Sequence, residues 1–144
     1  MEWEEYERKC EAICKENDTY LELFKEDLKN SGLAEKTIKH HVSNARFYIN
    51  EFLIHYEPYT MEKGPEMIFD FLGDFYIRKC LWSAPSNIKA TAASIKKFYK
   101  CMMEHNKIPK ENYNELCLTI SGCMETWQEL CAEYNDPDGS SSFF

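Results

Sequence analysis

Two stretches of the chain carry basic and small polar side chains whose types suit contacts with phosphate groups. In residues 35–47 and 86–100, Lys, Arg, His, Ser, Thr and Asn recur opposite a stripe of apolar residues. Lys and Arg neutralise phosphate charge, while hydroxyl, amide and imidazole groups bind phosphate oxygens or base edges. The candidate contact residues are Lys36, Thr37, Lys39, His40, Ser43, Arg46, Ser86, Asn87, Lys89, Lys96, Lys97 and Lys100.

A helical geometry places these residues on equivalent flanks of the two stretches. Ile38 belongs to the apolar stripe of the first stretch. At about 100° per residue, five polar residues in and just after this stretch lie roughly 80–160° from it, namely Lys36, Lys39, Ser43, Arg46 and Asn50. The lysines of the second stretch lie roughly 80–180° from Ile88 in the same sense. We call these two rows of polar residues the α-helical strips of the first and second stretch. If the two helices pack as neighbours, we expect the two strips to converge on one surface. The first turn of each helix then adds backbone N–H donors for phosphate.

Charge is segregated along the chain. The 144 residues have a formal net charge of −8, which by itself argues against a nucleic-acid partner. However, residues 78–110 hold eight bases and one acid, and residues 111–144 hold seven acids and no base. A solvated helix face normally mixes Glu with Lys, whereas residues 78–103 contain no acid. This stretch therefore favours an anionic partner over a face that is merely solvated.

The spacing of apolar residues predicts an all-α fold that positions the two strips. Helices are expected over residues 3–16, from an N-cap at Asn17 to a stop at Ser31 and Gly32, and over residues 34–56. Three more are expected: one from Pro65, one from an N-cap at Ser86 to about residue 105, and one from Pro109. The predicted organisation is an acidic N-terminal helix (1–16), a core domain (17–108), an acidic C-terminal helix packed on it (109–134) and a disordered tail (135–144). Phe47 lies opposite the apolar stripe, where it packs under the first helix or contacts a partner.

The cysteines predict no metal or cofactor site. Seven is an odd number, and most of the seven fall at helical positions, which is typical of reduced thiols rather than of a disulfide scaffold. Cys10 and Cys14 share a helical face but lack the further ligands of structural zinc. Cys80, Cys101 and His105 could gather, although we expect Cys101 and His105 at the edge of the core.

Three segments of the chain together resemble the sequence of a known family of domains. They are YLELFKEDLKNSGL (20–33), EKTIKHHVSNARF (35–47) and SNIKATAASIKKFY (86–99), the last followed by EHNKI (104–108). These segments resemble the amino-terminal, SAM-like core-binding domain of phage integrases and other tyrosine recombinases. The resemblance implies a SAM-like four-helix bundle, here with an additional helix at each end. It also implies that the second and fourth helices face duplex DNA, which places the candidate contact residues at that surface.

The chain departs from this family after the fourth helix. The family's catalytic domain surrounds a Tyr nucleophile with Arg, Lys and His, and it needs a much longer segment. The residues after Lys110 include Tyr113 and Tyr134 but no Arg, Lys or His. The expectation is therefore a free-standing DNA-binding module and not an enzyme.

Two functions stay open from the sequence. The first is a non-catalytic module that binds double-stranded DNA during DNA integration or recombination. The alternative is a helical protein-interaction module whose acidic ends, residues 1–28 and 111–144, regulate or partner a recombinase. The partners expected are thus DNA, a recombinase catalytic subunit or a second copy, with no small-molecule substrate. No apolar run reaches the roughly 18 residues of a membrane span, and the acidic N-terminus lacks a secretory signal, so a cytoplasmic location is expected.

Overall fold

The computed structural model describes residues 2–79 and 85–135, and within them the fold is all-α. No strand occurs in these residues, which confirms the predicted fold class. The elements in chain order are α1 (Trp3–Asn30), α2 (Glu35–Phe47), η1 (Tyr48–Phe52), η2 (Met61–Lys63), α3 (Gly64–Asp70), η3 (Phe71–Phe75), α4 (Tyr76–Lys79), α5 (Pro85–Glu104) and α6 (Lys110–Asn135). Of these, η1 and η3 are π-helical and η2 is a 3-10 turn. None of the described helices is long and apolar enough to cross a bilayer.

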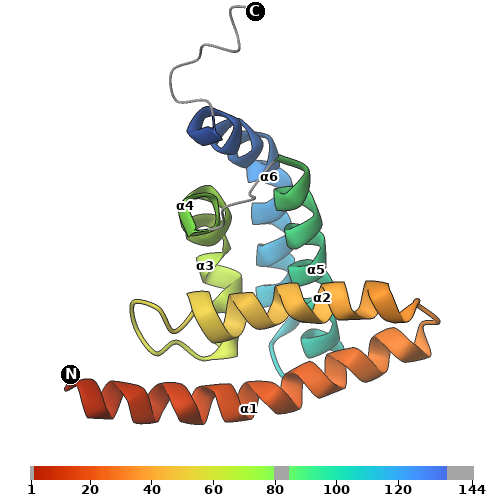
Figure 1. Ribbon diagram of the computed structural model, residues 1–144. Coiled ribbons are helices and arrows are strands. Elements are labelled where there is room, and N and C mark those ends of the chain that lie inside the picture. Colours follow the sequence, from red (N-terminus) through yellow and green to blue (C-terminus); the bar gives the residue numbers. More distant parts are fainter. Residues whose placement is uncertain (1, 80–84, 136–144) are drawn as a thin grey trace, which may run out of the picture.

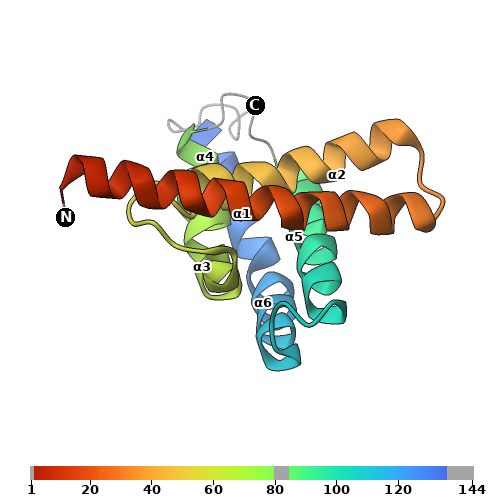
Figure 2. The same cartoon turned by 90° about the horizontal axis from the view of Figure 1, so that it is seen from below.

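The helices form two layers. α1 and α2 make an antiparallel hairpin, and α5 and α6 run antiparallel beside each other with α3 packed on α6 (Figure 1). The hairpin lies across α5, and both of its helices contact α5. Its connecting turn projects beyond α5 in the first view and again when the molecule is seen from below (Figure 2). The two helices that carry the candidate contact residues are therefore direct neighbours.

The core fills the space between these layers with the apolar stripes that the sequence predicts. In α2, the predicted positions Ile38, Val42 and Ala45 are all buried. Those of α5 are buried as well, namely Ile88, Ala92, Ile95, Tyr99 and Met102. Burial of these stripes forces the polar side of each helix toward solvent.

The helix expected over residues 34–56 ends earlier than its apolar spacing suggests. α2 passes at Tyr48 into the π-helical turn η1, which ends at Phe52. Tyr56, the last residue of the expected helix, lies beyond this turn and is 65% exposed. A π-helical turn closes i→i+5 bonds rather than i→i+4 bonds, so a stripe extrapolated at the α-helical period loses its register beyond it.

Residues 3–28 form one continuous helix rather than two. Asn17, the expected N-cap, lies in the middle of α1 and is buried. Its Nδ2 donates hydrogen bonds to the carbonyl oxygen of Ile49, at 3.2 Å, and to Oδ1 of Asn50, at 2.8 Å. The prediction of a helix start was wrong because this amide binds η1 and not the backbone that follows it.

Replacing Asn17 with Ala is expected to lower the free energy of unfolding by about 1–3 kcal/mol, because the buried acceptors on η1 lose their donor. Chemical denaturation of both proteins measures this difference. Asn114, an exposed residue of α6, provides the control. Its replacement by Ala should change stability by no more than about 0.5 kcal/mol. Equal effects at the two positions would contradict the role assigned to Asn17.

The helix starts also differ from expectation. α5 begins at Pro85, so Ser86 lies inside the helix and is not its N-cap. A proline is well suited to a first helical turn, because its missing N–H would have no intrahelical partner there. Two other parts of the sequence predictions, Cys80 and residues 136–144 of the tail, fall outside the described residues.

Candidate nucleic-acid interface

All twelve candidate contact residues have exposed side chains. They belong to α2 and α5, the helices that the hairpin brings together. Exposure follows from the fold, because the apolar stripe of each helix is buried and the polar flanks face solvent. The side chains are thus available to a partner, and their arrangement decides which of them act together.

α5 has the least compensated positive charge. Its four lysines, at 89, 96, 97 and 100, are exposed, and none forms an ion pair within 4.0 Å with a residue that the structure describes. The helix contains one acid, Glu104, at its last position. Because no carboxylate is interleaved with these lysines, their charges add along the exposed side of the helix.

A buried serine joins α2 to α5. Ser94 of α5 is fully buried, and its Oγ lies 2.7 Å from Nδ1 of His41. The same oxygen accepts a hydrogen bond from Nδ2 of Asn44 at 3.0 Å and donates one to the carbonyl oxygen of Ala90 at 3.2 Å. This network fixes the crossing of the two helices at the level of Ser94.

The junction is also electropositive. Burial lowers the pKa of His41, and the nearby charges of Lys97 and His40 act in the same direction. His40 Nε2 lies 3.4 Å from Nδ2 of Asn44, which itself reaches α5. Lys97 of α5 and His40 of α2 therefore both lie near His41, and their effect, added to that of burial, favours its neutral form.

The strip on α2 faces a different neighbour from the one expected. Lys39, Ser43 and Arg46 line a hollow with residues of α1, including Asp18 and Glu22. α5 instead meets the opposite flank of α2, through His41 and Asn44. The helices are neighbours, but this part of the α2 strip adjoins α1 and its acids. Lys39 also pairs with Glu35 at 3.8 Å.

Two of the α5 lysines border a second hollow. Lys97 and Lys100 line it together with Asp27, Ser31 and Glu104. α1 supplies Asp27 and α5 supplies Glu104, so acids flank the lysines at this end of the helix.

Phe47 lies against η3, a neighbour that the sequence did not predict for it. Its half-buried ring packs against Phe71 and Phe75 of η3, with centroid distances of 5.9 and 6.2 Å. The π-helical turn η3 therefore covers this end of α2, which a helical projection of α2 alone does not reveal.

The sequence did not single out His41, Asn44 or Ser94. Each is a polar residue on a helix flank, and one sequence contains no signal that separates a buried flank from an exposed one. The chain matches no protein-family model, no curated protein and no solved structure. The resemblance to the recombinase core-binding domain therefore rests on its three sequence segments alone.

Proposed function

We propose that this chain is a non-catalytic module that binds duplex DNA through the exposed side of α5 and its junction with α2. The observation that carries this proposal is the row of four exposed lysines, which form no ion pair with the described residues, on a helix without an interleaved acid. Through its resemblance to recombinase core-binding domains, the same proposal assigns the module to DNA integration or recombination.

The dimensions of α5 suit a phosphate backbone. Lys89 and Lys100 are separated by eleven residues, or about 16 Å of helix. A duplex segment of that length carries about ten phosphate charges. Several lysines can thus neutralise phosphates at once, and the release of counterions drives binding that weakens steeply with salt.

The two helices contribute unequally in this proposal. His41 and Asn44 hold α2 against Ser94 of α5, and His40 of α2 and Lys97 of α5 both lie near His41. By contrast, Lys39 and Arg46 share a hollow with Asp18 and Glu22 of α1, whose negative charges weaken the attraction of these two bases for phosphate, although Lys25 in the same hollow offsets part of this effect. We therefore expect the lysines of α5 to dominate the affinity.

The decisive experiment combines Lys89→Glu, Lys96→Glu and Lys100→Glu in one protein. Fluorescence anisotropy with a labelled duplex at several salt concentrations gives the affinity and its salt dependence. If each lysine contacts one phosphate, the slope of log K against log salt falls in magnitude by about 2.7, and binding at low salt is largely lost. We expect the triple variant to keep its fold, because these side chains are exposed.

A matched control carries the same charge change elsewhere. Lys9→Glu, Lys15→Glu and Lys110→Glu reverse three exposed charges outside the proposed surface, so both variants have the same net charge. The control should retain most of the wild-type slope. Equal losses in the two variants would show a response to net charge only, and the absence of binding by the wild-type chain would refute the proposal.

A second candidate function is protein binding by α6. Glu125, Glu129 and Glu133 form an exposed row at four-residue spacing, and Leu130 and Tyr134 are exposed beside it. Removing α6 is not a clean test, because its Trp127 is fully buried in the core. Changing the three glutamates to Gln tests it instead. Loss of a complex with a basic protein, at unchanged DNA affinity, would support this second function.

A further inference from the structure

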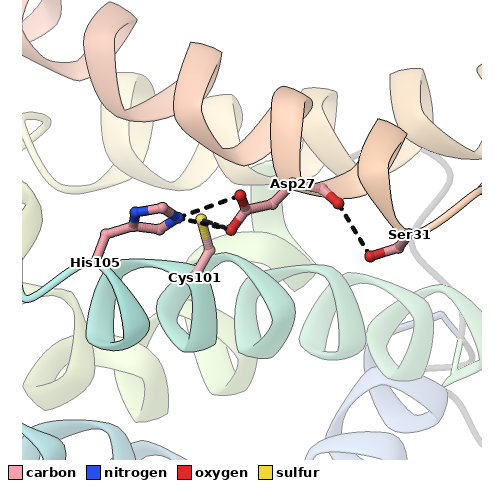
Figure 3. Close-up of polar contacts among 4 residues, drawn as sticks. All are labelled: Asp27, Ser31, Cys101 and His105. Atoms are coloured by element: carbon pink, nitrogen blue, oxygen red, sulfur yellow. Dashed lines mark hydrogen bonds and ion pairs between the residues drawn. The ribbon is translucent and has the colours of Figure 1, made fainter.

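Three different metal-ligand side chains meet where α1 crosses α5. Cys101 of α5 and His105, the residue that directly follows α5, are four residues apart in sequence, and their side chains point toward Asp27 of α1 (Figure 3). Nε2 of His105 lies 2.9 Å from Oδ2 of Asp27 and 3.2 Å from its Oδ1. Sγ of Cys101 lies 3.0 Å from Oδ2 of the same carboxylate. The three ligand atoms are all within 4.8 Å of one another.

The surrounding packing fixes the backbone on both sides of this cluster. Next to Asp27, Phe24 of α1 packs edge-on against Phe98 of α5, with ring centroids 5.4 Å apart, and both are fully buried. Leu28 is buried one residue after Asp27. The carboxylate on α1 and the thiol on α5 therefore face each other across a well-packed helix crossing.

The chemistry of the cluster differs from that of a cysteine nucleophile. An activated thiol is hydrogen-bonded to a histidine that takes its proton, whereas here the Cys101 thiol donates to the Asp27 carboxylate. Burial raises the pKa of this thiol, and the hydrogen bond to Asp27 raises it further. The hydrogen bond from Cys101 in turn lowers the pKa of the Asp27 carboxyl, against the effect of its own burial. A reactive free thiolate is therefore disfavoured.

The distances suit a tetrahedral ion. With bonds of about 2.3 Å to sulfur and about 2.0–2.1 Å to nitrogen and oxygen, neighbouring ligand atoms of Zn²⁺ lie about 3.3–3.6 Å apart. The observed contacts of 2.9 and 3.0 Å need to open by only about half an ångström. The side chains of His105 and Asp27 are 37% and 34% exposed, so an ion and a water molecule can reach them.

We propose that Asp27, Cys101 and His105 bind one divalent transition-metal ion, with Zn²⁺ as the first candidate, and so link α1 to α5. On binding, the Cys101 thiol loses its proton to solvent, and its thiolate and the Asp27 carboxylate together balance the charge of the ion. A water molecule takes the fourth position. The site with its bound ion has no net charge. It therefore does not repel the positively charged side chains of Lys97 and Lys100, which lie beside it.

This proposal departs from the expectation that the chain has no metal site. Cys101 and His105 were expected only at the edge of the core, and Asp27 is separated from Cys101 by 74 residues. A spacing of four residues between Cys and His on a helix is a weak signal, because structural zinc needs four ligands. The third ligand becomes visible only when α1 is placed on α5.

Cobalt titration of the full, reduced chain tests the site. Bound to a thiolate, Co²⁺ gives a charge-transfer absorption in the near ultraviolet, and the signal should saturate at one equivalent and disappear when Zn²⁺ is added. Cys101→Ser should abolish the band. Asp27→Asn and His105→Gln should retain it but weaken binding by about tenfold or more.

The matched control removes the other pair of cysteines at helical spacing. A Cys10→Ser, Cys14→Ser double variant should keep the cobalt spectrum of the wild type. Circular dichroism shows whether each variant is folded, and His105 is exposed enough that its replacement leaves the core intact. No cobalt band in the wild-type chain, or a band that persists in Cys101→Ser, would overturn the proposal.

Discussion

Replacing Gly64 with Ala is expected to lower the free energy of unfolding by about 3 kcal/mol or more. Gly64 is the first residue of α3 and is buried under two tyrosines. A Cβ atom at this position would overlap the hydroxyl of Tyr99 and approach Cε2 of Tyr48 to 3.0 Å. Both tyrosines are fully buried, so neither can move aside without displacing other core residues.

The hydrogen bonds around Gly64 add to this cost. The Tyr99 hydroxyl donates to the carbonyl oxygen of Met61 at 2.7 Å, and the Tyr48 hydroxyl donates to that of Gly64 at 2.6 Å. Displacing either ring leaves a buried polar group without its partner. Urea denaturation measures the loss. Adding Tyr99→Phe should recover part of it, although the ring carbon Cζ would still lie 2.5 Å from the new Cβ.

Gly122 is the matched control for this substitution. It lies within α6, is exposed, and has open space where a Cβ would be added. Gly122→Ala should therefore stabilise the protein by about 0.5–1 kcal/mol, because Ala has the higher helix propensity. If both Gly→Ala changes had the same sign, the close packing described at Gly64 would be wrong.

Replacing Trp127 with Ala is expected to cost about 3–5 kcal/mol. Trp127 is a fully buried residue of α6, and its ring lies against Gly73 of η3 and 6.3 Å from the ring of Phe69. The substitution therefore opens a large cavity between α6 and the segment formed by α3 and η3. Thermal or urea unfolding gives the difference in stability.

A comparison with Phe separates volume from polarity. The Nε1 atom of Trp127 is buried and has no hydrogen-bond partner among the described residues. Trp127→Phe removes this unsatisfied donor while it keeps most of the apolar surface, so its cost should be less than half that of Trp127→Ala. Trp3→Ala provides the control, because Trp3 is 69% exposed and its loss should matter little. Equal costs for Trp3→Ala and Trp127→Ala would contradict this packing of α6.

Much of the fold could be predicted from apolar spacing. The positions predicted to be buried in α5 are buried, since helical periodicity and residue type decide them without reference to the rest of the chain. Asn17 shows where such reasoning fails. Asn is a good N-cap residue, but this side chain binds the carbonyl oxygen of Ile49, 32 residues later in the sequence. Local preference alone cannot detect a distant partner.

For the candidate interface, too, the sequence predicts some features and leaves others to the tertiary structure. Its residue types and their exposure follow from the sequence, as does the absence of acids from residues 78–103. Which flank of α2 meets α5 does not follow, because both flanks of α2 carry polar residues. The buried bonds from His41 and Asn44 to Ser94 decide it, and they leave Lys39 and Arg46 beside α1.

By itself, the sequence determined the helical class, most of the buried stripes and the acid-free lysine row of α5, because each depends on residue type and helical period. Only the tertiary structure decided that α1 is one helix held to η1 by Asn17, and that the acids of α1 border part of the α2 strip. It also decided that Asp27 meets Cys101 and His105. These contacts join residues far apart in the chain, and they depend on the angles at which the helices cross.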